Sequence, residues 1–393
     1  MVTAKYVCLV QITPDRLFLL LVLLIVSTVL TPTAHAQDTD GIPLHGFADV
    51  GFSTHSSESN DPKGFNVGSL DFYLTPQFND RVKGLIEIIF ETTPEGEIAT
   101  DLERMQMGYT FSDAATAWAG RFHTPYGYWN TGFHHGAQMQ TSVARPRFLD
   151  FEDKGGILPA HMVGMLGTGK VRMSEGKLTY DIFTGNGPQV VMGEDATSTQ
   201  DYGTLSINAA GDDNRKAMSG LNIGYEASGN LDGLRLAVHM IRGEVTDDSG
   251  ATSALTPGLA AGPNNTELNI SGGSIMYFEN DWEILSEFYI FNNTDKSGTT
   301  GKNRSTASYI QIGKSFSSWT PFVRKEVVVL NQSDNYFTAQ ANGQSYNREA
   351  AGFKYDLNPK ASIKLELQNS DFAAGNRPAS SYRSLLLQHA IRF

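Results

Sequence analysis

Cysteine is nearly absent from this chain, since Cys8 is the only one among its 393 residues. Cys8 lies within a predicted export signal, so the mature protein is expected to contain no thiol. An exported protein of this size without disulfides must be stabilised by its fold alone, which excludes the small cross-linked secreted scaffolds. The same absence excludes thiol chemistry and cysteine-ligated metal sites.

Long apolar runs are equally scarce. The longest is the 14-residue stretch 17–30, "LFLLLVLLIVSTVL", which follows a basic leading region and precedes the small residues of "AHA" at 34–36. This order is typical of a cleavable signal peptide, and the run is short for a membrane-spanning helix, which needs about 20 residues. We therefore predict a signal peptide over 1–36 and one mature domain over 37–393. A membrane anchor is the alternative, and a true start downstream of Met1 is left open.

Positive charge is also in short supply, with 30 Lys and Arg against 42 Asp and Glu and a formal net charge of −12. Loss of Lys5, Asp15 and Arg16 with the signal makes the charge of the mature chain −13. Nucleic acid is therefore excluded as an expected partner, because its phosphates attract basic surfaces. No second apolar run reaches the roughly 18 residues of a helical span, so any residence in a membrane must use strands.

Beyond Gln37 the sequence alternates between apolar and polar residues, and helical periodicity is hard to find. In 360–370, for example, Leu365 lies between Lys364 and Glu366. A period of two is typical of strands whose faces meet different surroundings. We predict sixteen strands, at 43–54, 66–78, 81–92, 101–111, 114–123, 161–171, 176–184, 217–227, 233–242, 268–278, 282–291, 306–316, 320–330, 347–357, 360–370 and 381–393.

The connections between these strands differ in length in a regular way. Tight turns are predicted at Asn79, Ser112, Ser174, Ser228, Glu279, Ser317 and Asn358, and longer segments at 55–65, 124–160, 185–216, 243–267, 292–305 and 331–346. Short turns on one side, long loops on the other and an even strand count are what a transmembrane β-barrel requires. A spanning sheet must also close on itself, because lipid offers its backbone no hydrogen bonds. The pattern predicts an all-β fold, a 16-stranded antiparallel transmembrane β-barrel, whereas a soluble β-sandwich would not sort its loops by side.

The carboxyl end of the chain supports the same prediction. The last strand, "SLLLQHAIRF", ends on Phe393, with Leu387 and Ile391 on the face of that ring and His389 on the same face. This end resembles the terminal strand by which the barrel-assembly machinery recognises outer-membrane barrels. We therefore assign Phe393 as an assembly signal.

The longest connection follows the fifth predicted strand, and the most distinctive motif begins there. "GRFHTPYG" at 120–127 resembles the fifth-strand signature of the porin O/P family, the phosphate-selective porins and their relatives. The resemblance continues through "VARPRFLDFEDKGGILPAHMVGMLGTG" at 143–169, and more weakly through "LTYDIFTGNG" from Leu178 and "PFVRKEVV" from Pro321. The chain departs from the family at 128–129, where Tyr-Trp replaces an acidic residue, and its third loop has no dense basic ladder.

This resemblance implies a channel in the outer membrane of a Gram-negative cell. The partners implied are outer-membrane lipid, small hydrophilic solutes and two further copies of the chain in a homotrimer. The family's third extracellular loop folds inward to form a constriction, and the same is expected of 124–160 here. No cofactor is expected.

The aromatic residues of this motif have two interpretations. One is architectural: the rings anchor a barrel at the lipid interface or wedge a folded-in loop, and it covers Phe122, Tyr126, Tyr128, Trp129 and Phe133. The other is a metal or substrate site that uses the three histidines. His134 and His135 are adjacent, which points their rings apart in extended chain, and His123 has no carboxylate at a matching spacing. We therefore predict architecture and no metal.

Charged residues are the better candidates for a pore. The third loop carries Arg145, Arg147, Asp150, Glu152, Asp153 and Lys154, which we predict to line the constriction. The alternation puts Lys83, Arg104, Arg121, Arg324 and Lys364 on the water side of their strands, where they form the pore wall. Opposed charges across a narrow pore create a transverse field that selects solutes. The alternative is that the loop charges only solvate an extracellular surface. Glu87 and Glu366, also on the water side, are expected to tolerate substitution.

The function predicted is passive diffusion of small hydrophilic solutes or ions, without enzymatic activity, and with anion or phosphate selectivity left open. A hydrolase embedded in a barrel is one alternative, but it needs a nucleophile beside a histidine, and no "GxSxG" element occurs. A structural or adhesive barrel whose long loops bind partners is the other.

Overall fold

The structure is a computed structural model that describes residues 43–56, 63–92, 96–133, 136–152, 154–191, 203–207, 211–247, 265–298 and 300–393. The predicted signal peptide, with Cys8, lies outside the described residues. So do three residues named for the third loop, which are His134, His135 and Asp153.

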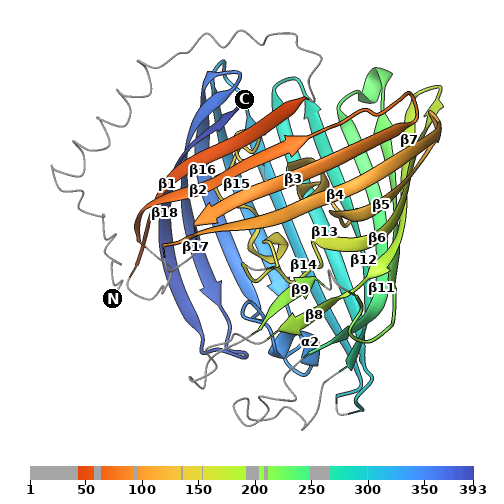
Figure 1. Cartoon of the computed structure of the whole chain (residues 1–393). Helices are drawn as coiled ribbons and strands as arrows, with labels where there is room; N and C mark the ends of the chain where they lie inside the picture. The colour runs from red at the N-terminus through yellow and green to blue at the C-terminus, as the bar shows by residue number, and fades with distance from the viewer. Residues whose placement is uncertain are drawn as a thin grey trace, which may run out of the picture. The chain divides into compact units, whose positions relative to one another are not determined.

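Sixteen antiparallel strands form a closed barrel, as the alternation predicts (Figure 1). Each strand pairs with its neighbours in chain order, and β1 closes the barrel against β18. The strands are β1 (Leu44–His55), β2 (Gly64–Leu74), β3 (Val82–Thr92), β4 (Ile98–Ser112), β5 (Ala115–His123), β6 (His161–Met173), β7 (Gly176–Asn186), β10 (Met218–Ala227), β11 (Leu234–Thr246), β12 (Asn265–Glu279), β13 (Trp282–Asp295), β14 (Lys302–Lys314), β15 (Trp319–Val329), β16 (Tyr346–Asn358), β17 (Ala361–Phe372) and β18 (Ser380–Arg392).

The barrel buries polar side chains and exposes apolar ones, the reverse of a soluble protein. In β17 the side chains of Lys364 and Glu366 are fully buried, whereas Leu367 is 54% exposed. A soluble sheet buries its apolar face, so a buried polar face beside an exposed apolar one means that the apolar side chains face lipid. The inward face of β17 is therefore the polar one. The same alternation places Ile88 outward and Glu87 inward in β3.

The two ends of the barrel differ as expected. β12 and β13 are joined by the two-residue turn Asn280–Asp281, whose φ angles of 54° and 64° suit a tight hairpin. The opposite end carries the long connections, including the short helix α2 (Asn335–Thr338) and a small sheet of β8 (Pro188–Val191) and β9 (Thr204–Ile207). Figure 1 shows the carboxyl terminus at the end with the tight turns and α2 at the other. No helix in the described part of the chain is long and apolar enough to cross a membrane.

The last residues of the β5–β6 hairpin are paired with each other but no longer with β4. Pairing of β5 with β4 stops at Arg121 opposite Met105, but β5 and β6 remain paired through His123 and His161. β4 continues along β3, with a shift of register at Glu103 that is typical of a β-bulge. The side chains of His123 and His161 at the end of the hairpin consequently contact Glu87 of β3 and Glu103 of β4. The segment 124–160 begins and finishes at this place.

Candidate functional site: the third loop and the barrel wall

The aromatic root of the third loop is buried against side chains of β13 and β14. Trp129 is 0% exposed and Tyr126 is 1% exposed, and both belong to the main hydrophobic cluster. The ring of Trp129 lies edge-on to Tyr309 of β14, with centroids 5.9 Å apart, and Tyr126 meets Tyr289 of β13 at 6.0 Å. Of the two architectural interpretations, the wedge that holds a folded-in loop is therefore the one that these contacts favour.

A carboxylate of the wall holds this root in place. Glu287 of β13 is 1% exposed and accepts hydrogen bonds from the backbone N–H groups of Tyr128 (3.1 Å) and Trp129 (2.9 Å). The hydroxyl groups of Tyr289 (2.5 Å) and Tyr309 (2.9 Å) donate to the same carboxylate. Trp129–Phe133 form a short π-helical turn, η1, which leaves its first N–H groups without partners in the turn itself. Glu287 supplies the acceptor that these groups need.

The middle of the loop is bound by a second and a third carboxylate. Glu366 of β17 accepts from the backbone N–H groups of Val143 (2.7 Å) and Ala144 (3.0 Å). Glu326 of β15 accepts from the backbone N–H of Arg147 (2.9 Å). Three strands of the wall thus each offer a buried carboxylate to backbone N–H groups that are far away in sequence.

Arginine and lysine side chains of the wall complete this attachment. Arg324 donates to the carbonyl oxygen of Ala144 (2.8 Å), and it pairs with both Glu326 (3.0 Å) and Glu366 (2.9 Å). Lys364 donates to the carbonyl oxygens of Ala137 and Ser142. Both basic residues, which the sequence assigns to the water side of the pore wall, are buried under the loop. They position it.

The predicted loop residues fall into two groups. Arg145 and Glu152 are buried, with exposures of 8% and 6%, and the guanidinium of Arg145 lies 4.1 Å from the ring of Phe151. Burial lowers the pKa of Arg145, and the charge of Asp150 opposes that shift. Asp150 and Arg147 are half-buried, and Arg147 donates to Asn342. Lys154 is exposed and its ammonium lies 3.0 Å from Glu91 of β3.

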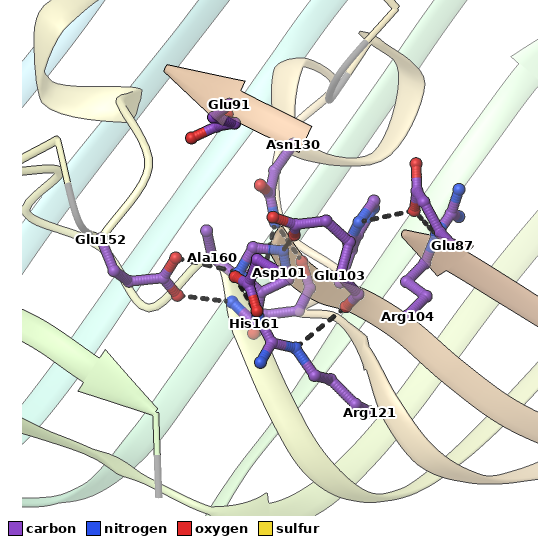
Figure 2. A network of polar contacts seen from close by, with 12 residues as sticks. Glu87, Glu91, Asp101, Glu103, Arg104, Arg121, Asn130, Glu152, Ala160 and His161 are labelled. Atoms are coloured by element: carbon purple, nitrogen blue, oxygen red, sulfur yellow. Dashed lines mark hydrogen bonds and ion pairs between the residues drawn. The ribbon is translucent and has the colours of Figure 1, made fainter. Parts of the chain in front are cut away.

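Three further wall residues lie on β3, β4 and β5. Arg104 forms an ion pair with Glu87. Arg121 donates to the carbonyl oxygen of Glu103 (3.0 Å) and to the carboxylate of Asp101 (3.2 Å). Figure 2 shows Arg121 beside both residues. The ammonium of Lys83 lies 4.9 Å from the centre of the Trp118 ring. Lys83, Arg104 and Arg121 are therefore separate from Arg324 and Lys364, which the loop covers.

An open space remains beside the loop. A cavity of about 610 Å³ is lined by side chains of the wall and of the loop, among them Tyr73, Glu87, Arg104, His123 and Met139. Phe393 and Arg392 also line it, so it extends toward the end with the tight turns. Among the predicted wall cations, Arg104 is the one on this lining.

Sequence reasoning missed the carboxylates that hold the loop. Alternation does place Glu287, Glu326 and Glu366 on polar faces, and this was the available signal. It also missed His161, which lies between Glu103 and Glu152 (Figure 2). These partners come from strands distant in sequence, so no local spacing reveals them.

Comparison with solved structures finds the same fold in outer-membrane proteins. An anion-selective porin from Comamonas acidovorans matches with 10% identity and a TM-score of 0.56, over 90% of this chain and 99% of that chain. The outer membrane channel DcaP of Acinetobacter baumannii matches with 9% identity and a TM-score of 0.55, over 92% and 100%. OmpT of Vibrio cholerae, solved in a trimer form, matches with 11% identity and a TM-score of 0.52, over 90% and 99%.

Matches at such low identity establish the fold, a closed 16-stranded barrel of the porin type. No protein-family model matches the chain, and no curated protein matches it in sequence. The resemblance to the porin O/P family therefore stays a prediction.

Proposed function

We propose that this protein is an outer-membrane channel for the passive diffusion of small hydrophilic solutes or ions. The observation that carries the proposal is the attachment of the third loop: the inward carboxylates Glu287, Glu326 and Glu366 bind its backbone N–H groups. A loop held in this way narrows a barrel of sixteen strands, which is otherwise wide enough for a water-filled lumen. The cavity beside the loop is the space left for solutes.

The loop's contacts support its placement inside the barrel. It reaches β13, β15 and β17 through the carboxylates, and β3 through Lys154 and Glu91. In the circular strand order, β3 and β15 are separated by five strands on the shorter path. A single segment can contact inward side chains of both only from within the barrel. The passage then runs between the loop and the β1–β4 wall.

The remaining parts of the proposal follow from the fold and its neighbours. Signal cleavage after Ala36 would deliver the chain for insertion by the barrel-assembly machinery, with Phe393 as the signal for assembly. A location in the Gram-negative outer membrane and a homotrimeric state are supported by neighbours described as outer-membrane channels and, in one case, as a trimer form. Selectivity for anions is supported only by the name of one neighbour, so a general channel is the statement we make.

A channel without enzymatic activity fits the described residues better than a hydrolase. The buried histidines His123 and His161 face carboxylates, and His239 lies against the rings of Tyr126 and Tyr289. The described residues do contain one histidine–serine contact, between Nδ1 of His55 and Oγ of Ser384 at 2.7 Å, but it joins β1 to β18 and neither residue lines the cavity beside the loop. The ion pairs of the loop also have a use in a channel, because they fix the charges that solutes meet.

Planar-bilayer recordings test the proposal directly. The purified mature protein should give discrete conductance steps in salt solution, and a salt gradient should give a reversal potential that reports charge selectivity. Folded protein that inserts but conducts no ions would contradict the channel and favour the structural or adhesive alternative.

A further inference from the structure

A cluster of nitrogen and oxygen donors lies where the β5–β6 hairpin leaves β4. Glu103, His123 and His161 each offer one ligand atom, and these atoms all lie within 4.8 Å of one another. The three residues are buried, with exposures of 5%, 8% and 3%. They come from three different strands, β4, β5 and β6, so the cluster exists only in the folded barrel.

Two imidazoles and one carboxylate are a donor set that suits zinc. Zn²⁺ binds histidine nitrogen and carboxylate oxygen at roughly 2.0–2.2 Å, and sites with three protein ligands keep a fourth position open. Hard cations such as Mg²⁺ and Ca²⁺ prefer all-oxygen ligands, so the two imidazoles select a transition metal. We propose that Glu103, His123 and His161 form a binding site for a divalent transition-metal ion, with Zn²⁺ as its representative.

Glu152 prepares His161 for this role. Its Oε2 atom lies 2.9 Å from Nδ1 of His161, and its Oε1 accepts the backbone N–H of the same residue at 2.7 Å. Metal-binding histidines commonly donate their second ring N–H to a carboxylate, which fixes the orientation of the ring. The opposite nitrogen, Nε2, then points at Oε2 of Glu103, 2.5 Å away. Figure 2 shows His161 between these two carboxylates.

A metal ion between His161 and Glu103 needs more room than the metal-free arrangement gives. Nε2 of His161 and the Glu103 oxygen must move apart from 2.5 Å, because two metal–ligand bonds of about 2 Å need a wider separation. Glu103 lies at a bulge, where the strand departs from regular pairing, so its backbone is not fixed by a ladder on both sides.

The charges around the cluster favour a cation. Glu103 and Glu152 bring two carboxylates to His161, and Arg104 and Arg121 form ion pairs with Glu87 and Asp101 instead. A divalent cation bound here would add positive charge next to these two buried carboxylates, which favours its binding.

The cluster adjoins the cavity beside the loop through one of its three ligands. His123 lines the 610 Å³ cavity beside the loop, together with Glu87 and Arg104. Because Glu152 and His161 lie at the end of the third loop and Glu103 lies on the wall, the metal would tie the loop to β4. The inference does not depend on conduction, because a site in the folded barrel binds metal whether or not the barrel is a channel.

Metal titration of the purified mature barrel tests the site. The protein is stripped with EDTA in detergent and titrated with Co²⁺, whose visible absorption reports nitrogen and oxygen ligands, and Zn²⁺ is then added as a competitor. We expect one equivalent of Co²⁺ to bind and Zn²⁺ to displace it. His123→Asn and His161→Asn should abolish the absorption, and Glu152→Gln should weaken binding roughly 10–100-fold, as outer-shell changes do.

The control is His389→Asn, because His389 lies on β18 opposite Val50 of β1 and Ile363 of β17, whereas the cluster lies on β4, β5 and β6. It should bind Co²⁺ as the unmodified protein does. Heat-modifiable migration in gels verifies folding of each variant, and Glu103→Gln replaces a histidine variant that fails this check. An absence of Co²⁺ absorption in the stripped protein, or equal affinities in His123→Asn and His389→Asn, would overturn the proposal. Conductance measured in parallel keeps this outcome separate from the fate of the channel.

Discussion

The Nη2 atom of Arg324 lies 2.9 Å from Oε1 of Glu366, and both side chains are completely buried. The two residues come from β15 and β17, so the pair bridges the intervening strand on the inner face of the barrel. Arg324 also donates to Ala144 in the third loop, and Glu366 accepts from the backbone of that same residue. The pair therefore binds the loop through both the backbone N–H and the backbone carbonyl of Ala144.

Removal of Arg324 should be costly. Arg324→Met leaves Glu326 and Glu366 without their shared cation in a buried place, and breaking a buried pair by removing one partner costs about 3–5 kcal/mol. Equilibrium unfolding in urea measures the loss. The neighbouring Lys325 is the control, since its pair with Glu349 lies on the outward face of β15 and β16, away from the loop, and Lys325→Met should cost much less. Equal losses for the two variants would mean that the loop does not bury Arg324.

Glu287 should matter for the order of the loop root. Glu287→Gln keeps the shape of the side chain but removes the charge that accepts from Tyr128 and Trp129. Hydrogen bonds to charged groups contribute about 1.5–3 kcal/mol each, so the local opening free energy at these amides should fall by a similar amount. Amide hydrogen exchange at residues 128–133 is the measurement. Glu279→Gln, at an exposed strand end, should leave the exchange unchanged.

The sequence predicts the barrel well because lipid and water impose one rule on every strand. Leu365 and Glu366 must face opposite ways, and that rule can be read without knowing any partner. What meets Glu366 on its own side is decided by a loop segment 222 and 223 residues away, and these contacts lead us to expect that substitution of Glu366 is costly, which alternation alone does not reveal. His161 is a similar case, because its neighbour Glu103 comes from another strand. Alternation assigns a face but not a contact.

The lipid face should respond to charge according to depth. Leu365→Arg or Ile88→Arg should cost roughly 2–4 kcal/mol, because both positions are assigned to the middle of outward-facing strand surfaces. Ile391→Arg provides the comparison, since Ile391 lies two residues from the chain end and near the interface, where the cost falls to roughly 0–1 kcal/mol. Reversible folding into lipid vesicles gives the three values. Similar costs at all three positions would contradict the assigned depth.

Asp334 should make one loop sensitive to pH. It caps α2 by accepting the backbone N–H of Tyr336 at 3.1 Å, and it accepts from Asn293 at 2.9 Å. Burial raises its pKa from 3.8 to about 6, although both hydrogen bonds oppose the shift. Because the folded pKa is the higher one, this contribution to stability is complete below the unfolded value and is lost as the pH rises through about 6.

The difference amounts to something on the order of 3 kcal/mol, and Asp334→Asn should remove it while keeping an oxygen that can cap the helix. Hydrogen exchange across 335–340, corrected for the intrinsic rate, should therefore show more opening at about pH 8 than at about pH 4 in the unmodified protein only. An unchanged pH dependence in the variant would assign the effect to another group.

The ion pair of Glu87 and Arg104 should set the sign of selectivity, because both residues line the cavity beside the loop. Two unit charges 4 Å apart interact by roughly 4 kcal/mol at an effective dielectric constant of about 20, so an unopposed charge there acts strongly on a passing ion. Arg104→Gln leaves Glu87 and should move the reversal potential toward cations. Glu87→Gln leaves Arg104 and should move it toward anions.

Arg242→Gln is the matched control for this pair of shifts. Arg242 pairs with Glu267 at 2.7 Å, and the arginine side chain is 67% exposed on the outward face of β11, away from the cavity beside the loop. Its removal should leave the reversal potential unchanged in the same salt gradient. Shifts of the same sign from Glu87→Gln and Arg104→Gln, or a shift from the control as large as theirs, would place the ion path away from the β3–β4 wall. Shifts of opposite sign would place the ion path in the cavity between the β3–β4 wall and the third loop, because Glu87 and Arg104 both line that cavity.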